Sequence, residues 1–235
     1  MNLLLFTESD RLDSRRIRVT DRRLDHLRGV LKSAPGDSIR VGELQGKLGI
    51  GELLEIDDEQ AILSVELNQA PPARMPLYLV LALPRPKMLR RILRSVAELG
   101  VDQIHLINSY RVEKSYWQTP VLQPDIVNEY LMHGLEQAQD TILPTVYCHQ
   151  RFKPFAEDVL PDLIKDRRAL LAMPGDHPTC PREVRQDLLL AIGPEGGWIP
   201  YEIEKLREAG CSPASIGQRV LRVETAVVAL LARLQ

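Results

Sequence analysis

The stretch LLLAIGPEGGWIPYEIEKL, residues 188–206, joins a strand pattern to a helical pattern through a glycine-rich turn. The apolar run Leu188–Ile192 ends at Gly193-Pro194-Glu195-Gly196-Gly197, and the helical pattern Tyr201–Ala209 follows shortly afterwards. Glycine has no Cβ and adopts positive φ freely, so a ligand can approach the backbone of such a turn closely. In an open α/β sheet, ligands bind at the carboxyl ends of the strands. The stretch therefore predicts an α/β sheet with a ligand site directly after Ile192.

The chain from about residue 77 onward repeats this alternation of strands and helices. Such alternation predicts a mostly parallel sheet with helices on both faces, which is the α/β class. The predicted strands are Leu77–Leu83, Gln103–Ile107, Thr145–Tyr147, Ala169–Met173, Leu188–Ile192 and Ala214–Ile216. The predicted helices, from apolar residues at helical spacing, are Met88–Leu99, Asp125–Ala138, Tyr201–Ala209 and Glu224–Leu234.

The first part of the chain has short strand patterns separated by glycine turns. The predicted elements are the strands Leu3–Phe6, Ser38–Val41, Gly51–Ile56 and Ala61–Leu67 and a short helix at Asp21–Leu31. This pattern is typical of a small β-barrel. The proline-rich segment NQAPPARMP, residues 68–76, is interpreted as a linker. We therefore expect a barrel domain over residues 1–70 and a larger α/β domain over residues 71–235.

Composition limits the class of protein. The 235 residues carry a net charge of −2 and are 44% hydrophobic, so a nucleic-acid-binding surface has to be local. Cys148, Cys180 and Cys211 lie far apart without a CxxC pair, which argues against a disulfide framework or a structural zinc site. The histidines are scattered and HExxH is absent, so no metal site is expected. The N-terminal apolar run is too short for a signal peptide, and no run reaches the roughly 20 residues of a membrane helix, so we expect a soluble cytoplasmic protein.

Two further loops follow predicted strands. Pro174-Gly175-Asp176 comes after Ala169–Met173, and IGQRVLRVETA, residues 216–226, comes after the last strand. Arg219 and Arg222 are spaced by one helical turn, so their guanidinium groups are expected to face one site. Each loop taken alone also fits an ordinary connection, and Arg222 also fits an ion pair with Glu224 at a helix start. Glu202 and Glu204 place negative charge at the start of the preceding helix, which disfavours phosphate as the ligand there.

Basic residues cluster in two places. RPKMLRRILR, residues 85–94, contains no acidic residue, and a second group of arginines lies between residues 15 and 28. Each cluster alone fits a solvated surface, but together they favour contacts with RNA phosphates. The predicted RNA-binding residues are Arg22, Arg23, Arg28, Arg85, Lys87, Arg90 and Arg91.

The motifs LAIGPEGGW, residues 190–198, and IGQRVLRVETA, residues 216–226, resemble the C-terminal signature of the ribosomal RNA uridine-N3 methyltransferase family of the SPOUT superfamily. Weaker matches are RLDHLRGVLKSAPGD, residues 23–37, SVAELGVDQI, residues 95–104, and LEQAQDTILP, residues 135–144. The resemblance covers nearly the whole chain. It implies a trefoil-knotted SPOUT domain, an N-terminal barrel similar to PUA and OB domains, and a homodimer that methylates small-subunit ribosomal RNA.

The resemblance also implies a cofactor and a set of site residues. The cofactor is S-adenosylmethionine, held by the three glycine loops. The residues implied to contact it are Leu171, Ala172, Met173, Gly193, Pro194, Glu195, Gly196, Ile216, Gly217, Val220, Leu221, Arg222 and Thr225. The candidate catalytic residues are Arg222 and Arg219, which can stabilise a uridine anion, and Glu224, which can orient an arginine or accept a proton. Glu195 is a second carboxylate candidate.

The chain departs from the family pattern on the side of the RNA substrate. The motif Glu136-Gln137 continues with Ala138-Gln139-Asp140 where the family has a small residue, Gly and Arg, and Ser95 stands where a Lys is frequent. These changes leave two alternatives open. One is a SPOUT relative with another RNA target, and the other is an RNA-binding protein that has lost catalysis.

Overall fold

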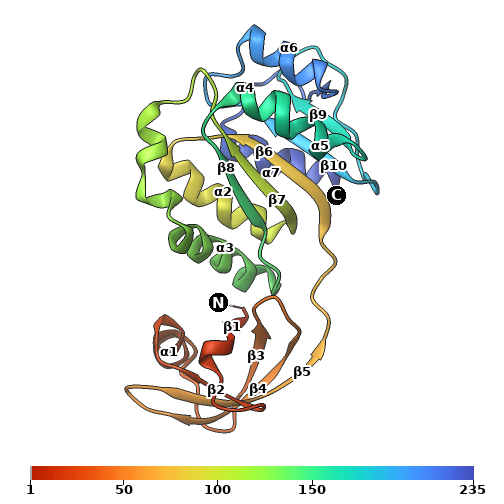
Figure 1. The fold of residues 1–235 in the computed structure, drawn as a ribbon. Coiled ribbons are helices and arrows are strands. Elements are labelled where there is room, and N and C mark those ends of the chain that lie inside the picture. Colours follow the sequence, from red (N-terminus) through yellow and green to blue (C-terminus); the bar gives the residue numbers. More distant parts are fainter. Residues whose placement is uncertain (1) are drawn as a thin grey trace. The chain divides into compact units, whose positions relative to one another are not determined.

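The computed structural model describes residues 2–235, which divide into two compact units (Figure 1). The first unit contains the chain up to Ala73 together with Met132–Leu143. The second contains Arg74–Leu131 and Pro144–Gln235. The helix α3, Pro124–Ala138, is continuous between them. The division expected from the sequence, 1–70 and 71–235, does not include Met132–Leu143 in the first part.

The first unit is built on a curled five-stranded sheet in the order β1-β3-β4-β5-β2. Its strands are β1 (Leu4–Phe6), β2 (Arg16–Val19), β3 (Ser38–Glu43), β4 (Leu48–Ile56) and β5 (Ala61–Gln69). β1 pairs with β3 in parallel, and the other pairs are antiparallel. Alternate residues of the strands point inward, and Phe6, Ile17 and Leu63 are completely buried in the core. The predicted small β-unit made of short strands is confirmed.

Two local details of this unit differ from the sequence-based expectation. The helix expected at Asp21–Leu31 is present, but it consists of α1 (Arg22–His26) followed by a π-helical turn over Leu27–Leu31. The linker is shorter than residues 68–76, because β5 runs to Gln69 and the next strand begins at Met75. Pro76 is tolerated in that strand because the pairing with its neighbour shifts register between Met75 and Tyr78.

The second unit contains a six-stranded, fully parallel sheet in the order β11-β9-β10-β6-β7-β8. Its strands are β6 (Met75–Ala82), β7 (Val101–Ile107), β8 (Thr145–His149), β9 (Arg168–Ala172), β10 (Leu188–Ile192) and β11 (Ser212–Ala214). All five residues of β10 are buried, as expected for a strand covered on both faces. Because β9, β10 and β11 are parallel neighbours, the loops that follow them leave the sheet at the same edge.

Helices cover both faces of this sheet, which confirms the predicted α/β class. Figure 1 shows α2 (Pro86–Glu98) and α7 (Val223–Leu234) on one face, where they pack against each other. On the other face lie α4 (Phe152–Pro154), the π-helical turn Phe155–Val159 and α5 (Leu160–Ile164). The helix α6 is formed by Pro200–Glu208, and short 3-10 turns occupy Glu8–Asp10, Lys114–Gln118 and Pro120–Leu122. No helix within residues 2–235 is long and apolar enough to span a bilayer.

A pair of histidines joins two strands of the second unit. His105 Nδ1 of β7 lies 3.1 Å from His149 Nε2 of β8, and the rings stack with centroids 5.4 Å apart. Tyr147 and Phe155 pack around the pair, and Gln103 Oε1 lies 3.3 Å from His105 Nε2. Burial, and secondarily the charge of His149, lowers the pKa of His105 to about 4. Burial also lowers the pKa of His149.

The free energy of unfolding is therefore expected to decrease as the pH is lowered below about 6.5. The unfolded chain binds a proton at its ordinary pKa of 6.5, whereas folded His105 remains neutral down to about 4. For this residue the loss is about 1.4 kcal/mol per pH unit, or at most about 3 kcal/mol near pH 4. Denaturant unfolding of the wild type and of His105→Phe between these pH values measures it. The variant keeps an aromatic ring and should show a shallower slope, and equal slopes would contradict the assignment.

Candidate active site

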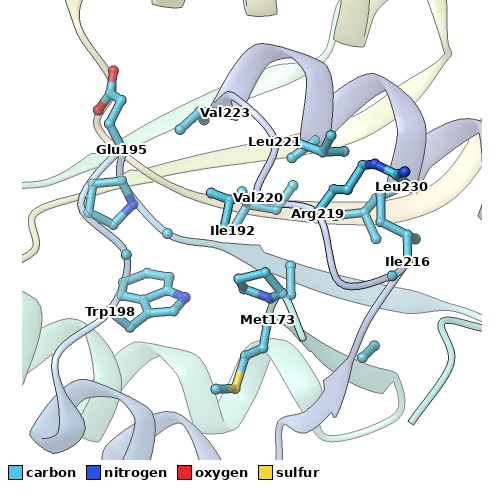
Figure 2. A pocket seen from close by; sticks show the side chains of 18 of the residues that line it. Met173, Ile192, Glu195, Trp198, Ile216, Arg219, Val220, Leu221, Val223 and Leu230 are labelled. Carbon is cyan, nitrogen blue, oxygen red and sulfur yellow. The ribbon is translucent and has the colours of Figure 1, made fainter. Parts of the chain in front are cut away.

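The loops after β9, β10 and β11 and one face of α7 enclose a cavity of about 330 Å³ (Figure 2). This volume is at the lower end of the range that ligand pockets occupy. Many of the residues predicted for the cofactor or for catalysis line it, namely Ala172, Met173, Gly193, Pro194, Glu195, Ile216, Gly217, Arg219, Val220 and Leu221. The structure therefore brings all three predicted loops together around one cavity.

Other predicted site residues lie outside this cavity. Leu171 is completely buried within β9, because alternate residues of a strand face opposite sides of the sheet. Gly196 faces away, toward Arg111, whose guanidinium donates to the Gly196 carbonyl oxygen. Glu224 and Thr225 line a separate shallow groove with Arg91 and Ser95. The predicted cofactor contacts of Leu171, Gly196 and Thr225 and the predicted catalytic role of Glu224 therefore stay predictions, at positions that do not line the cavity.

The expectation that Arg219 and Arg222 lie on one helical turn was wrong. Residues 217–222 form an irregular loop, and α7 begins only at Val223, with Arg222 as its N-cap residue. Arg219 lines the cavity, whereas Arg222 is exposed beside it at the start of α7. Within residues 2–235 the Arg222 side chain makes no ion pair with Glu224 at hydrogen-bonding distance, so the alternative of a salt-bridged helix start is not realised.

Several lining residues were missed by sequence reasoning. Val223, Ala226 and Leu230 follow one another at helical spacing on the face of α7 that forms a wall of the cavity. That spacing was visible but is equally typical of core packing. Trp198 directly follows the glycine turn, and its ring forms another wall (Figure 2). The remaining missed residues are Pro174, Ile192, Gly197, Ile203 and Ala214.

Trp198 gives the cavity an unsatisfied hydrogen-bond donor. Its side chain is 8% exposed, and within residues 2–235 its buried Nε1 has no hydrogen-bond partner. A Cβ on Gly193 would lie 3.0 Å from this nitrogen, so the ring packs closely against a position that only glycine leaves open. A buried indole N–H normally finds an acceptor. The cavity thus fits a ligand with a flat apolar part and a nearby polar acceptor.

Gly217 joins the first and third loops. It has a φ of +135°, a conformation that side chains rarely adopt. Its N–H donates to Ser215 Oγ at 3.1 Å, and its carbonyl accepts from the N–H of Gly175 at 3.1 Å. The backbone polar groups of Gly217 therefore hold the loops to each other.

The two carboxylates near the glycine turn hold the fold together. Glu195 accepts a hydrogen bond from the N–H of Arg85 at 3.1 Å, at the start of α2, and in Figure 2 its carboxylate points away from Trp198 and Met173. Glu202, in the first turn of α6, is 2% exposed and accepts from Ser109 Oγ, Tyr110 N and Ile199 N. Negative charge is favourable at a helix N-terminus. Glu195 thus contacts the backbone at the start of α2, and its candidate role in the chemistry stays a prediction.

The basic residues of α2 form one exposed face. Leu89, Ile92, Leu93 and Val96 are buried, while Arg85, Lys87, Arg90, Arg91 and Arg94 are exposed. The guanidinium carbons of Arg90 and Arg94 lie 5.9 Å and 5.0 Å from the ring centroid of Tyr130. Arg91 reaches the shallow groove beside Glu224. This face places positive charge next to the start of α7.

The three arginines of the first unit that were predicted to bind RNA, Arg22, Arg23 and Arg28, are engaged in ion pairs. Arg22 makes a bidentate contact with Glu136, at 2.6 and 3.0 Å, and Arg28 pairs with Asp58. Arg23 is only 11% exposed and binds Asp10 and Asp21. Burial alone would raise the pKa of Asp10, but hydrogen bonds from Arg23 and Thr7 outweigh it and lower the pKa. The guanidinium of Arg23 is therefore already bound inside the unit, and its predicted contact with RNA stays a prediction.

Gln139 and Asp140, which differ from the family pattern, directly follow the last residue of α3. Gln139 has a φ of +58°, the left-handed conformation found just after helix C-termini, for which glycine is the least strained residue. Asp140 is 4% exposed, and its carboxylate accepts from the N–H groups of Thr141 and Ile142. Asp140 therefore holds the buried turn that follows α3, and its position does not require a loss of activity.

Comparison with known proteins gives a consistent result. Residues 71–235 match the model of a family described as an RNA methyltransferase domain. The chain is 32% identical to ribosomal RNA small subunit methyltransferase E of Treponema pallidum, over 99% of this chain and 90% of that one. A crystal structure of ribosomal RNA small subunit methyltransferase E from Neisseria gonorrhoeae, bound to S-adenosyl methionine, superposes with a TM-score of 0.79 at 21% identity, covering 98% and 95% of the chains. A putative methyltransferase from Legionella pneumophila, in complex with the same cofactor, gives a TM-score of 0.77 at 20% identity, covering 98% and 95%.

Proposed function

The chain belongs to the RNA methyltransferase family that includes ribosomal RNA small subunit methyltransferase E, and on that premise we propose that it transfers a methyl group from S-adenosylmethionine to N3 of a uridine in small-subunit ribosomal RNA. Its fold is that of the SPOUT methyltransferases. The observation that carries the proposal is the single cavity that the loops after β9, β10 and β11 form.

The residues of the cavity fit this cofactor. Apolar side chains such as Ile192, Val220 and Leu230 suit the faces of an adenine ring, and the unpaired Trp198 Nε1 offers a donor to a polar atom. Gly193, Gly197 and Gly217 line the cavity without adding a side chain to it. When bound, the cofactor supplies an electrophilic methyl group attached to a sulfonium. The chain contributes a cavity that places this group, since position and alignment dominate an in-line displacement.

The second requirement is a uridine whose N3 has lost its proton. The resulting anion is spread over O2, N3 and O4, and a fixed positive charge beside these oxygens stabilises it. Arg222 at the start of α7 and Arg219 at the cavity wall are the proposed sources of that charge. Glu224, in the first turn of α7 and in the groove with Arg91, is proposed to orient the substrate or an arginine, with proton acceptance through water as the second option.

The proposed RNA contacts extend along the exposed face of α2. RNA binding should weaken steeply with salt, with a log–log slope of about 0.7–0.9 per contacted phosphate. We expect Arg90→Ala combined with Arg91→Ala to reduce this slope by about 1.4–1.8, the loss of two phosphate contacts. Filter binding of small-subunit ribosomal RNA at several salt concentrations measures it. The matched control combines Arg182→Ala with Arg185→Ala, two exposed arginines of the same unit near the amino end of β10. An equal change in both double variants would contradict the proposed surface.

The proposal is tested most directly by mapping the modified nucleotide. Ribosomal RNA from a strain that lacks the gene should lose one N3-methyluridine by mass spectrometry, and the purified protein with tritiated S-adenosylmethionine should restore it. Loss of another modified nucleotide would identify a different RNA target. Binding without transfer, to naked RNA and to assembled subunits, would support the alternative of an RNA-binding protein. Native mass spectrometry of the same sample tests the proposed homodimer.

A further inference from the structure

The turn Ser109–Arg111, which follows β7, is attached to the first turn of α6 and to the glycine turn. On one side, buried Glu202 accepts from Ser109 Oγ at 3.1 Å and from the N–H of Tyr110 at 2.8 Å. On the other side, the guanidinium of Arg111 donates to the carbonyl oxygen of Gly196. The neighbours of Gly196 on both sides, Glu195 and Gly197, line the cavity. The turn is therefore bound to Gly196, a residue whose two sequence neighbours form part of the cavity wall.

This rigid turn presents an aromatic ring to solvent. Ser109 is 2% and Val112 is 8% exposed, and the N–H of Val112 closes the turn on the carbonyl of Ser109 at 3.0 Å. Tyr110, between them, is 79% exposed. Within residues 2–235 its ring makes no stacking or cation–π contact. A rigid, exposed aromatic ring costs little entropy when it stacks on a ligand, because its backbone is already ordered.

Positive charge accompanies this ring. Arg111 is exposed, and Lys114 follows on the same loop, also exposed. Only one guanidinium nitrogen of Arg111 is committed to Gly196, and a guanidinium has further N–H donors. An aromatic face beside free cationic donors is the combination that proteins use to bind an unpaired nucleotide, with stacking on the base and ion pairing to the phosphate.

We propose that the turn Ser109–Arg111 receives the target nucleotide, with Tyr110 stacked on its base and Arg111 bound to its phosphate. This assignment rests on the proposed RNA methylation and adds a substrate contact outside the cofactor loops. Tyr110 would bind substrate, and Glu202 would act as a positioning residue that holds Tyr110 in place.

The test compares Tyr110→Ala, Tyr110→Phe and Tyr110→Trp in tritium transfer to small-subunit ribosomal RNA. Base stacking on an aromatic ring corresponds to about a 5- to 150-fold effect per base. We expect the alanine variant to lose this factor in kcat/KM for RNA, the Phe and Trp variants to retain most of it, and the calorimetric Kd for S-adenosylmethionine to stay unchanged in all three. The control, Tyr201→Ala, removes a tyrosine of α6 that is 43% exposed. Unchanged kcat/KM in Tyr110→Ala, or equal losses in Phe and Ala variants, would overturn the proposal.

A second measurement does not depend on catalysis. Small-subunit ribosomal RNA containing 4-thiouridine is irradiated with the wild-type protein, and the crosslinked peptides are identified after trypsin digestion. Residues 95–111 form one tryptic peptide that ends at Arg111. A crosslink at Tyr110 without methyl transfer would support the nucleotide contact and contradict the proposed activity. Transfer without any crosslink in this peptide would support the activity and contradict the contact.

Discussion

Replacing Arg222 by Ala is expected to lower the single-turnover rate of methyl transfer by roughly 100- to 1000-fold, the usual effect of losing one group that stabilises developing negative charge. Arginine keeps its proton throughout the working pH range, so it acts as a fixed charge and not as the base. Because Arg222 lies outside the cavity, the Kd of S-adenosylmethionine should change little. The rate is measured at saturating cofactor.

The variant Arg222→Lys tests whether the positive charge alone is enough or whether the planar guanidinium group is also needed. Lys keeps the positive charge but loses the planar fork, so partial activity is expected from Lys and little from Ala. Arg222 is also the N-cap residue of α7, and its carbonyl accepts from the N–H of Ala226. That contact uses the backbone and survives both substitutions, so the melting temperature should stay close to that of the wild type. Near-normal turnover of folded Arg222→Ala would remove the proposed catalytic role.

Gly193→Val should weaken the binding of S-adenosylmethionine by roughly 5- to 150-fold, which corresponds to the 1–3 kcal/mol typical of overpacking. A Cβ at Gly193 would lie 3.0–3.2 Å from three atoms of the Trp198 ring. The valine methyl groups would then displace the ring or fill the cavity. Isothermal titration calorimetry gives the Kd, and circular dichroism verifies the fold.

Two other glycines provide controls for this experiment. Gly29→Val adds the same side chain in the first unit, where a Cβ would meet nothing within 4 Å, and should leave the Kd unchanged. A Cβ at Gly196 would lie 2.9 Å from Cδ of Arg111, a flexible side chain that can move. Gly196→Val should therefore disturb RNA methylation more than cofactor binding. If Gly193→Val bound the cofactor as tightly as the wild type, the cavity would not be the cofactor site.

The sequence was most informative where one local pattern has one structural outcome. The short apolar run before the glycine turn was predicted as a strand, and β10 has the predicted bounds. Phe152–Ile164 was not predicted, because Pro154 and Pro161 interrupt the helical pattern and the helical pieces are very short. Contacts between distant residues were also invisible. Nothing in the sequence pairs Arg22 with Glu136 or Ser109 with Glu202, since these side chains meet only in the folded chain.

The same limit explains how the candidate site was assigned. The glycine loops could be placed at strand ends because parallel strands end at a common edge. The direction of each side chain at those ends could not be predicted. Gly196 was expected to contact the cofactor and Trp198 was not, but Trp198 lines the cavity and Gly196 contacts Arg111 instead. Arg219 and Arg222 were expected to face one site because three residues make one helical turn, but both precede the helix predicted at Glu224–Leu234, and helical spacing does not apply in an irregular loop.

The assignment of Met132–Leu143 to the first unit affects when that unit can fold during synthesis. Glu136 binds Arg22, Thr141 Oγ1 donates to the carbonyl of Gly46, and the N–H of Gln45 donates to the carbonyl of Thr141. A nascent chain that has left the ribosome only as far as Ala73 lacks all of these partners. The N-terminal unit is thus completed only after the chain has been translated as far as Leu143, and a segment transplanted into another protein that ended at Ala73 would lack these contacts.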